Sequence, residues 1–123
     1  PVAGRMPGHM YVLLAEAGVD YSRMLEMESV NDRFKDADVA LVVGACDVVN
    51  PAATDREGTP ISGMPILLAH HAKAVVVCNL DAEPGYSGVP NPLYAMDKTQ
   101  MLLGDARTTT ERLLMELNRE EGQ

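Results

Sequence analysis

The feature that most constrains the fold is the stretch of residues 37–51. Its first half, residues 39–43, is a short apolar run dominated by β-branched residues, and Gly44 ends it. Such a run predicts a central strand that is buried on both faces. Because ligands of open parallel sheets bind outside the carboxyl ends of the strands, the stretch also predicts that Gly44 to Asp47 lie at the rim of a ligand cleft. The alternative is a buried strand followed by an ordinary Asp/Asn/Pro turn.

Length and charge narrow the class of protein. A chain of 123 residues, 46% of them hydrophobic, predicts one globular domain that spans residues 1–123. The formal net charge of −8 disfavours nucleic acid and anionic membrane surfaces as partners. No apolar run approaches the roughly 20 residues of a membrane span. Cys46 and Cys78 each end an apolar run, which predicts free thiols in a reducing compartment, and no zinc-type Cys/His spacing is present.

The first third of the chain predicts helical and irregular structure before the strand at residues 39–43. Residues 9–17 predict an amphipathic helix whose Met/Leu stripe faces the core, with Gly18 at its C-terminal end. Residues 24–27 are a candidate short strand. The polar residues 28–38 predict a surface helix or turn.

The rest of the chain alternates loops with strands. Residues 50–65 predict a long loop, and Pro65 predicts the first turn of a helix in which Ile66, Leu67 and Ala69 are buried. Residues 74–78 predict a second buried strand and residues 101–103 a short third one. Thr108 and Glu111 fit the capping box of a last helix. Its apolar face is predicted to consist of Leu113, Leu114 and Leu117.

This order of elements predicts an α/β domain with a mostly parallel sheet. Each strand end carries Gly or Asn with Asp nearby. These pairs are Gly44 with Asp47, Asn79 with Asp81, and Gly104 with Asp105. Because the carboxyl ends of parallel strands share one edge of the sheet, the convergence favours a cleft over an ordinary turn. A G-x-G-x-x-G/A motif between a first strand and a helix is absent from the sequence.

Several longer motifs resemble a known family, the NADP(H)-binding domain of proton-translocating nicotinamide nucleotide transhydrogenase, which is the C-terminal part of its β subunit. The resemblance is collinear and runs from residue 1 to about residue 118. The motifs that carry it lie at residues 1–10, 12–17, 39–51, 63–65, 85–86, 91–92 and 103–106.

The resemblance implies a Rossmann-like fold, with an open, mostly parallel sheet and helices on both faces. It implies that the domain holds NADP(H) for hydride exchange with NAD(H) on a separate domain, coupled to proton movement through a membrane domain. The implied partners are therefore NADP(H), the NAD(H)-binding domain and the membrane domain. The implied location is the cytoplasmic side of the cell membrane, or the matrix side of the mitochondrial inner membrane, without insertion by this chain.

The resemblance also assigns site residues. Asp47 matches the acidic residue near the nicotinamide end that is linked to coupling, and is the one catalytic residue implied. Gly85 and Tyr86 match a lid loop, and Asp105 and Ala106 match a contact near the adenosine end. The remaining implied cofactor contacts are Val2, Ala3, Gly4, Arg5, Met6, Pro7, Gly44, Ala45, Cys46, Val48, Gly63 and Met64.

Three departures from the family pattern matter. The chain starts at Pro1, without the strand, glycine motif and helix that open the family's domain, so we expect it to be cut from something longer. Asn79, Leu80 and Asp81 stand where the family usually has Lys-Arg-Ser around the 2′-phosphate. This change favours NAD over NADP, or weak binding of both, because a carboxylate repels a phosphate and accepts bonds from a ribose diol. Cys46 stands where the family often has Asn.

Three hypotheses follow. The first is a transhydrogenase component, in which the nucleotide supplies the hydride chemistry and the isolated chain is inactive alone. The second is a divergent module that binds a nucleotide without catalysis, favoured by residues 79–81. The third is a fragment that completes its fold with an upstream segment or another copy.

Overall fold

The structure is a computed structural model that describes residues 9–121, and a parallel three-stranded sheet lies at its centre. The strands are β1 (Val39–Val43), β2 (Ala74–Asn79) and β3 (Thr99–Leu103), in the order β1-β2-β3. The register pairs Val42 of β1 with Val77 of β2, and Val77 with Met101 of β3. The fold class predicted from the sequence, an open parallel α/β sheet, is confirmed.

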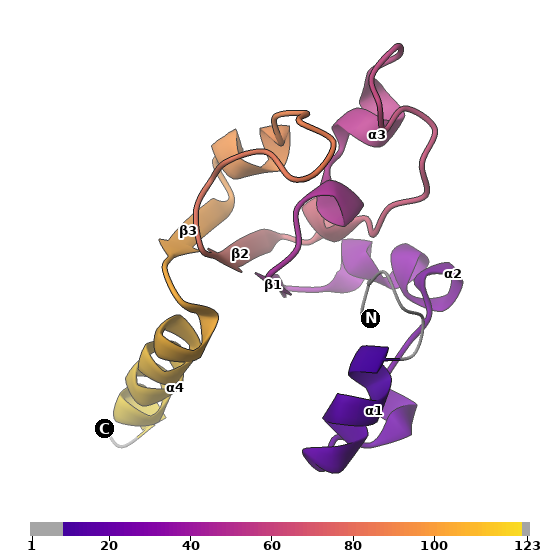
Figure 1. Ribbon diagram of the computed structural model, residues 1–123. Coiled ribbons are helices and arrows are strands. Elements are labelled where there is room, and N and C mark those ends of the chain that lie inside the picture. Colours follow the sequence, from indigo (N-terminus) through magenta and orange to yellow (C-terminus); the bar gives the residue numbers. More distant parts are fainter. Residues whose placement is uncertain (1–8, 122–123) are drawn as a thin grey trace.

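The helices are mostly short. The α-helices are α1 (His9–Glu16), α2 (Met27–Val30), α3 (Ala52–Asp55) and α4 (Ala106–Glu121), and the 3-10 helices are η1 (Tyr21–Arg23), η2 (Asn31–Asp36), η3 (Asp47–Val49), η4 (Ala69–His71) and η5 (Pro92–Ala95). Helix α4 packs on β2 and β3, and α1 lies near the β1 side of the sheet, as Figure 1 shows. The predicted Gly18 terminus of α1 is confirmed, with φ at 89°, the left-handed conformation that favours glycine.

One face of the sheet carries the main core. Ala40 and Val42 of β1 and Val75 and Val77 of β2 are buried there against η2, η4, η5 and the connecting segments. Leu93 of η5 is fully buried in the same cluster. A second, smaller cluster lies around α3 and contains Ala52, Ala53, Ile61, Ile66 and Val89. Residues of the loops that follow β1 and β2 pack into these two clusters.

The prediction that residues 39–43 form a central strand buried on both faces is wrong in part. The strand exists, but β1 is an edge strand of the described sheet, and the side chains of Val39, Leu41 and Val43 are about half exposed. A β-branched run shows that a strand is apolar on both faces, and burial of both faces also requires neighbours. The predicted core stripe of α1 is wrong for the same reason, because Met10 and Leu13 are exposed.

Two further local predictions are wrong. Residues 24–27 form no strand, because no strand edge among the described residues pairs with them. Pro65 starts no helix. Instead, Leu67 N donates to Val48 O at 2.7 Å, and Leu68 N donates to Asn31 Oδ1 at 2.9 Å, so the backbone of this segment bonds to other elements. Burial of Ile66, Leu67 and Ala69 is nevertheless confirmed.

The start of α4 differs from the predicted capping box. The carboxylate of Asp105 accepts from Thr108 N at 3.3 Å and from Thr108 Oγ1 at 3.2 Å, so Asp105 caps the helix in place of Thr108. Leu114 and Leu117 on the predicted apolar face are more than half exposed. No helix of the described residues is long and apolar enough to cross a lipid bilayer.

Candidate functional site

The carboxyl ends of the three strands converge, as the sequence predicts. Gly44 N, directly after β1, donates to Cys78 O of β2 at 3.1 Å, and Gly104 N, directly after β3, donates to Asn79 O at 3.0 Å. Both glycines have positive φ, 66° and 136°, which turns the chain out of the sheet at the same edge. The loops after β1 and β2 therefore lie against each other.

Asp47 is the centre of this contact. It opens η3, and its half-buried carboxylate accepts from Ser87 Oγ at 2.7 Å through Oδ1 and from Ser87 N at 3.1 Å through Oδ2. A Cβ on Gly85 would lie 3.0 Å from Asp47 Oδ2, so glycine leaves the room that the carboxylate occupies. The structure thus brings together two predicted site residues, Asp47 and Gly85, and adds Ser87, which sequence reasoning missed.

Buried amides fasten the same two loops elsewhere. Asn50, which is fully buried, accepts from Ala52 N at 2.9 Å and donates at 3.3 Å to the carbonyls of Val89 and Pro90. Asn91 Nδ2 donates to Cys46 O at 3.1 Å. These amides were also missed. An Asn-Pro pair occurs at residues 50–51 and again at residues 91–92, and each pair is a turn signal in the sequence. The signal does not reveal which distant residue the Asn side chain bonds to.

Asn79, at the end of β2, also forms a hydrogen bond to the loop that follows β1. Its Nδ2 donates to Ala45 O at 2.9 Å and to Tyr94 OH at 2.9 Å, and its Oδ1 is buried with no hydrogen-bond donor among the described residues. Burial raises the pKa of the Tyr94 phenol, and its hydrogen bond with Cys46 raises it further, so the phenol stays neutral. Asn79 is therefore a structural link between loops, directed away from the exposed residues that follow it.

The rim beyond Asn79 is acidic. Leu80 is 75% exposed, and Asp81 Oδ1 accepts from Glu83 N at 3.0 Å in a tight turn. Tyr86 is 92% exposed on the same loop. Residues 79–97 contain no Lys or Arg. Exposed carboxylates at this rim would repel a phosphate group and can accept hydrogen bonds from hydroxyl groups.

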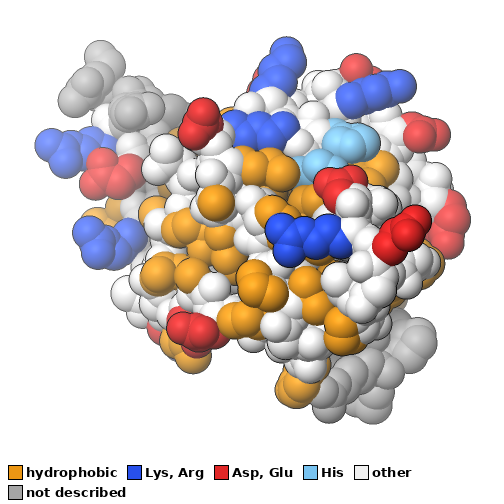
Figure 2. All heavy atoms as spheres, turned by 90° about the horizontal axis from the view of Figure 1, so that it is seen from above, with side chains coloured by type: hydrophobic (Ala, Val, Ile, Leu, Met, Phe, Trp, Pro, Cys, Tyr) orange, Lys and Arg blue, Asp and Glu red, His pale blue; other side chains and the backbone are white. Residues whose placement is uncertain are grey.

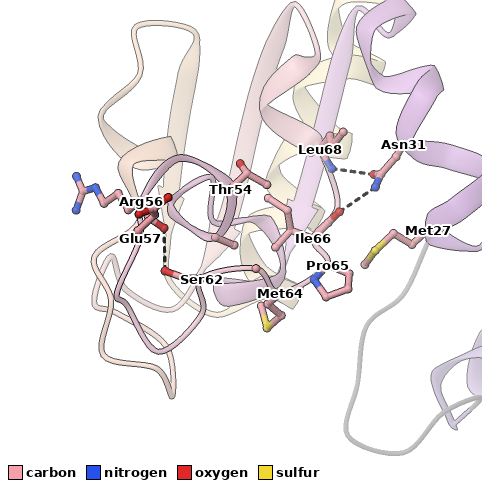
Figure 3. Close-up of a pocket in the computed structure, with 12 residues that line it drawn as sticks. Met27, Asn31, Thr54, Arg56, Glu57, Ser62, Met64, Pro65, Ile66 and Leu68 are labelled. Atoms are coloured by element: carbon pink, nitrogen blue, oxygen red, sulfur yellow. Dashed lines mark hydrogen bonds between the residues drawn. The ribbon is translucent and has the colours of Figure 1, made fainter.

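The other predicted site residues occupy separate places. Gly44, Ala45 and Val48 line a hollow of about 560 Å³ between β1 and α1. Gly63 and Met64 line a second hollow of about 610 Å³, shown in Figure 3, where Met27 and Met64 flank Pro65 and the Arg56 guanidinium points outward. Asp105 and Ala106 lie at the start of α4. The predicted contacts Val2, Ala3, Gly4, Arg5, Met6 and Pro7 lie outside the described residues.

His70 and His71 lie at the opposite end of the strands from this edge. His70 and His71 belong to η4, which precedes the start of β2, and their ring centroids are 4.5 Å apart. Figure 2 shows the histidines side by side, with apolar and charged side chains around them. Within residues 9–121 no three His, Cys, Asp or Glu side chains gather in a way that could hold a metal ion. Cys46 and Cys78 are free thiols.

Comparison with known proteins decides the family. Residues 1–116 match the family described as NAD(P) transhydrogenase beta subunit. The chain belongs to this family. Two curated relatives, each described as NAD(P) transhydrogenase subunit beta, come from Rhodospirillum rubrum, the second from a designated strain of that species. Each is 50% identical to the chain over 118 residues.

The coverage of the two sequences is unequal. The matched region is 96% of this chain but 25% of each relative, so the chain spans about a quarter of the transhydrogenase beta subunits it matches. The resemblance stated from the sequence motifs is confirmed at the level of the family.

Proposed function

We propose that this chain is the nicotinamide-nucleotide-binding domain of a proton-translocating transhydrogenase, and that it holds NADP(H) for hydride exchange with NAD(H). The observation that carries the proposal is the family match across residues 1–116, which includes the whole strand-end edge. The nucleotide supplies the hydride chemistry, and the protein supplies position and electrostatics. The partners of the domain would be an NAD(H)-binding domain and a membrane domain, on the cytoplasmic or matrix side of the membrane.

The geometry is compatible with these roles. The turn of residues 44–48 presents backbone groups and the Asp47 carboxylate at the edge where parallel sheets bind ligands. Asp47 would orient the nicotinamide end, and Gly85 and Tyr86 would cover the nucleotide from the loop that already contacts Asp47. Asp105 and Ala106 would lie near the adenosine end, and Gly63, Met64 and residues 2–7 would complete the contacts.

A second candidate is a module that prefers NAD(H) or binds without catalysis. The acidic rim favours it. Asn79 is fixed between Ala45 O and Tyr94 OH, and Asp81 and Glu83 follow it without any cation up to residue 97. A ribose 2′-hydroxyl suits this rim, whereas a 2′-phosphate would be repelled.

Calorimetric titration of the naturally occurring protein with NADP⁺, NADPH, NAD⁺ and NADH tests both candidates. We expect nicotinamide nucleotides to bind, and failure of all four to bind would overturn the proposed function.

If the acidic rim sets the preference between NAD(H) and NADP(H), Asp81→Ser strengthens NADP(H) binding roughly fivefold, about 1 kcal/mol, with little change for NAD(H). Asp97→Ser is the matched control, since it removes an exposed carboxylate just before β3 begins. Markedly tighter NADP(H) binding by the unmodified protein would reject the NAD preference and favour the first candidate.

A further inference from the structure

One serine fastens the loop of residues 80–91 to the loop that follows β1. Ser87 donates to Asp47 twice, from Oγ to Oδ1 at 2.7 Å and from N to Oδ2 at 3.1 Å. The same Ser87 Oγ accepts from Val89 N at 3.1 Å. The hydroxyl therefore stands between the carboxylate and the backbone of its own loop, and both oxygens of Asp47 are engaged by one residue.

The backbone next to Ser87 is shaped to the carboxylate. The three Asp47 atoms Oδ1, Oδ2 and Cγ lie 3.0–3.1 Å from the position that a Cβ on Gly85 would take. Gly88 has φ at 72° and its N–H donates to Gly85 O at 3.0 Å, which closes a tight turn around Ser87. The turn and the carboxylate fit each other only while Asp47 keeps its present side-chain conformation.

The contact pairs two donors of Ser87 with the acceptor oxygens of the Asp47 carboxylate. Both Ser87 groups act as donors, and an ionised carboxylate offers only acceptors, so the contacts are of the stronger, charge-assisted kind. Two of the roughly four acceptor positions of the carboxylate are used by Ser87, and the others remain for another donor. A group bound at this edge can thus contact Asp47 while the loop stays attached.

We propose that Ser87 is a positioning residue that fixes the Asp47 side chain and holds the 80–91 loop against the strand-end edge, so that a bound nucleotide leaves slowly. The proposal rests on the function proposed above. Ser87 acts through Asp47 and takes no part in hydride transfer. The loop is also held at residues 89–91, where Asn50 donates to the carbonyls of Val89 and Pro90 and Asn91 donates to Cys46 O. Loss of the Ser87 hydroxyl is therefore expected to loosen residues 85–89 without unfolding the whole loop.

The experiment compares five variants of the naturally occurring protein with the unmodified protein. Ser87→Ala removes the hydroxyl, and Ser87→Thr restores it. Ser29→Ala changes an exposed serine of α2 and serves as control. Asp47→Ala is prepared alone and with Ser87→Ala. Hydrogen exchange of the amides of residues 87 and 89 measures the loop, and the fluorescence decay of bound NADPH or NADH during displacement measures nucleotide release.

We expect Ser87→Ala to speed exchange at these amides and nucleotide release each about tenfold. Ser87→Thr restores most of both rates, and Ser29→Ala changes neither. Because Ser87 acts through Asp47, Ser87→Ala adds little to the exchange rate once Asp47→Ala is present. Unchanged exchange in Ser87→Ala, or equal and additive effects of the two substitutions, would overturn the proposal.

The two proposals fail in distinguishable ways. Exchange rates need no nucleotide, so they test the contact between Ser87 and Asp47 directly. If neither NADPH nor NADH binds the unmodified protein, the proposed function and the slow-release role are both overturned, and the exchange data alone decide whether Ser87 positions Asp47. If a nucleotide binds and Ser87→Ala leaves its release rate unchanged, the slow-release role is overturned and the proposed function stands.

Discussion

Strands β1 and β2 have nearly the same composition and very different surroundings. Val75, Val77 and Cys78 of β2 are fully buried, whereas Val39, Leu41 and Val43 of β1 have 58%, 51% and 49% of their surface exposed. β2 has a strand on each side and α4 on it, and β1 has one neighbouring strand in the described sheet. An apolar β-branched run therefore predicts a strand, while its burial depends on neighbours that the run does not encode.

The largest expected effect compares equivalent truncations in the two strands. Val77→Ala should cost about 2 kcal/mol of the free energy of unfolding, because it leaves a cavity in a closely packed region. Leu41→Ala should cost less than about 0.5 kcal/mol, since its side chain is half exposed. Urea denaturation of both variants measures the difference. A cost for Leu41→Ala equal to that of Val77→Ala would mean that this face of β1 is covered in solution.

A comparable effect is expected where the loops after β1 and β2 meet. Asn50→Ala should cost about 2 kcal/mol, because it leaves Ala52 N and the carbonyls of Val89 and Pro90 without their buried partner. The matched control is Asn118→Ala on the exposed surface of α4, which should be close to neutral. Denaturation midpoints compare the two. Similar midpoints would show that water replaces the Asn50 amide without cost.

The smallest effect concerns the opposite end of the strands. Burial lowers the pKa of His70, and His71 and Lys98 lower it further against the opposing effect of Asp55, so the folded protein favours the neutral imidazole. A base with a lowered folded pKa adds stability above its unfolded pKa of about 6.5, and this is lost as the pH falls toward the folded value. Thermal unfolding between pH 7.5 and 5.5 should show a modest decline that His70→Gln reduces. Because His71 contributes to the lowered pKa of His70, His71→Gln should reduce the decline less than His70→Gln does, and an identical decline in both variants would contradict the assignment.

The sequence predicted those features that depend on local pattern. All three strands, the glycine ends of β1 and β3 and the convergence of their carboxyl ends were correct, because apolar runs and Gly breaks are local signals. The strand expected at residues 24–27 and the helix expected after Pro65 were wrong. No strand of the described sheet pairs with residues 24–27, and the segment after Pro65 bonds to residues that are distant in the sequence. Neither condition is visible in a short stretch of sequence.

The candidate site shows the same division. Gly85 was identified through a resemblance, and Asp47 through both its place after the first strand and the resemblance. Their mutual contact emerged from the structure. Ser87, Asn50, Asn91 and Tyr94 were missed because each makes a side-chain bond to a residue far away in the sequence. Single polar side chains in a loop carry no periodicity that would reveal such a bond.

The parallel arrangement of the sheet also has a consequence for how the chain folds. Val39 pairs with Ala74, and Val75 pairs with Thr99, so both strand pairings join distant segments and neither can start from a hairpin. Each pairing needs a long loop to close before its hydrogen bonds can form, and closure costs entropy before the contacts offset it. The rate of folding is therefore governed by these closures, and the short helices, which form quickly, cannot by themselves bring the strands into register.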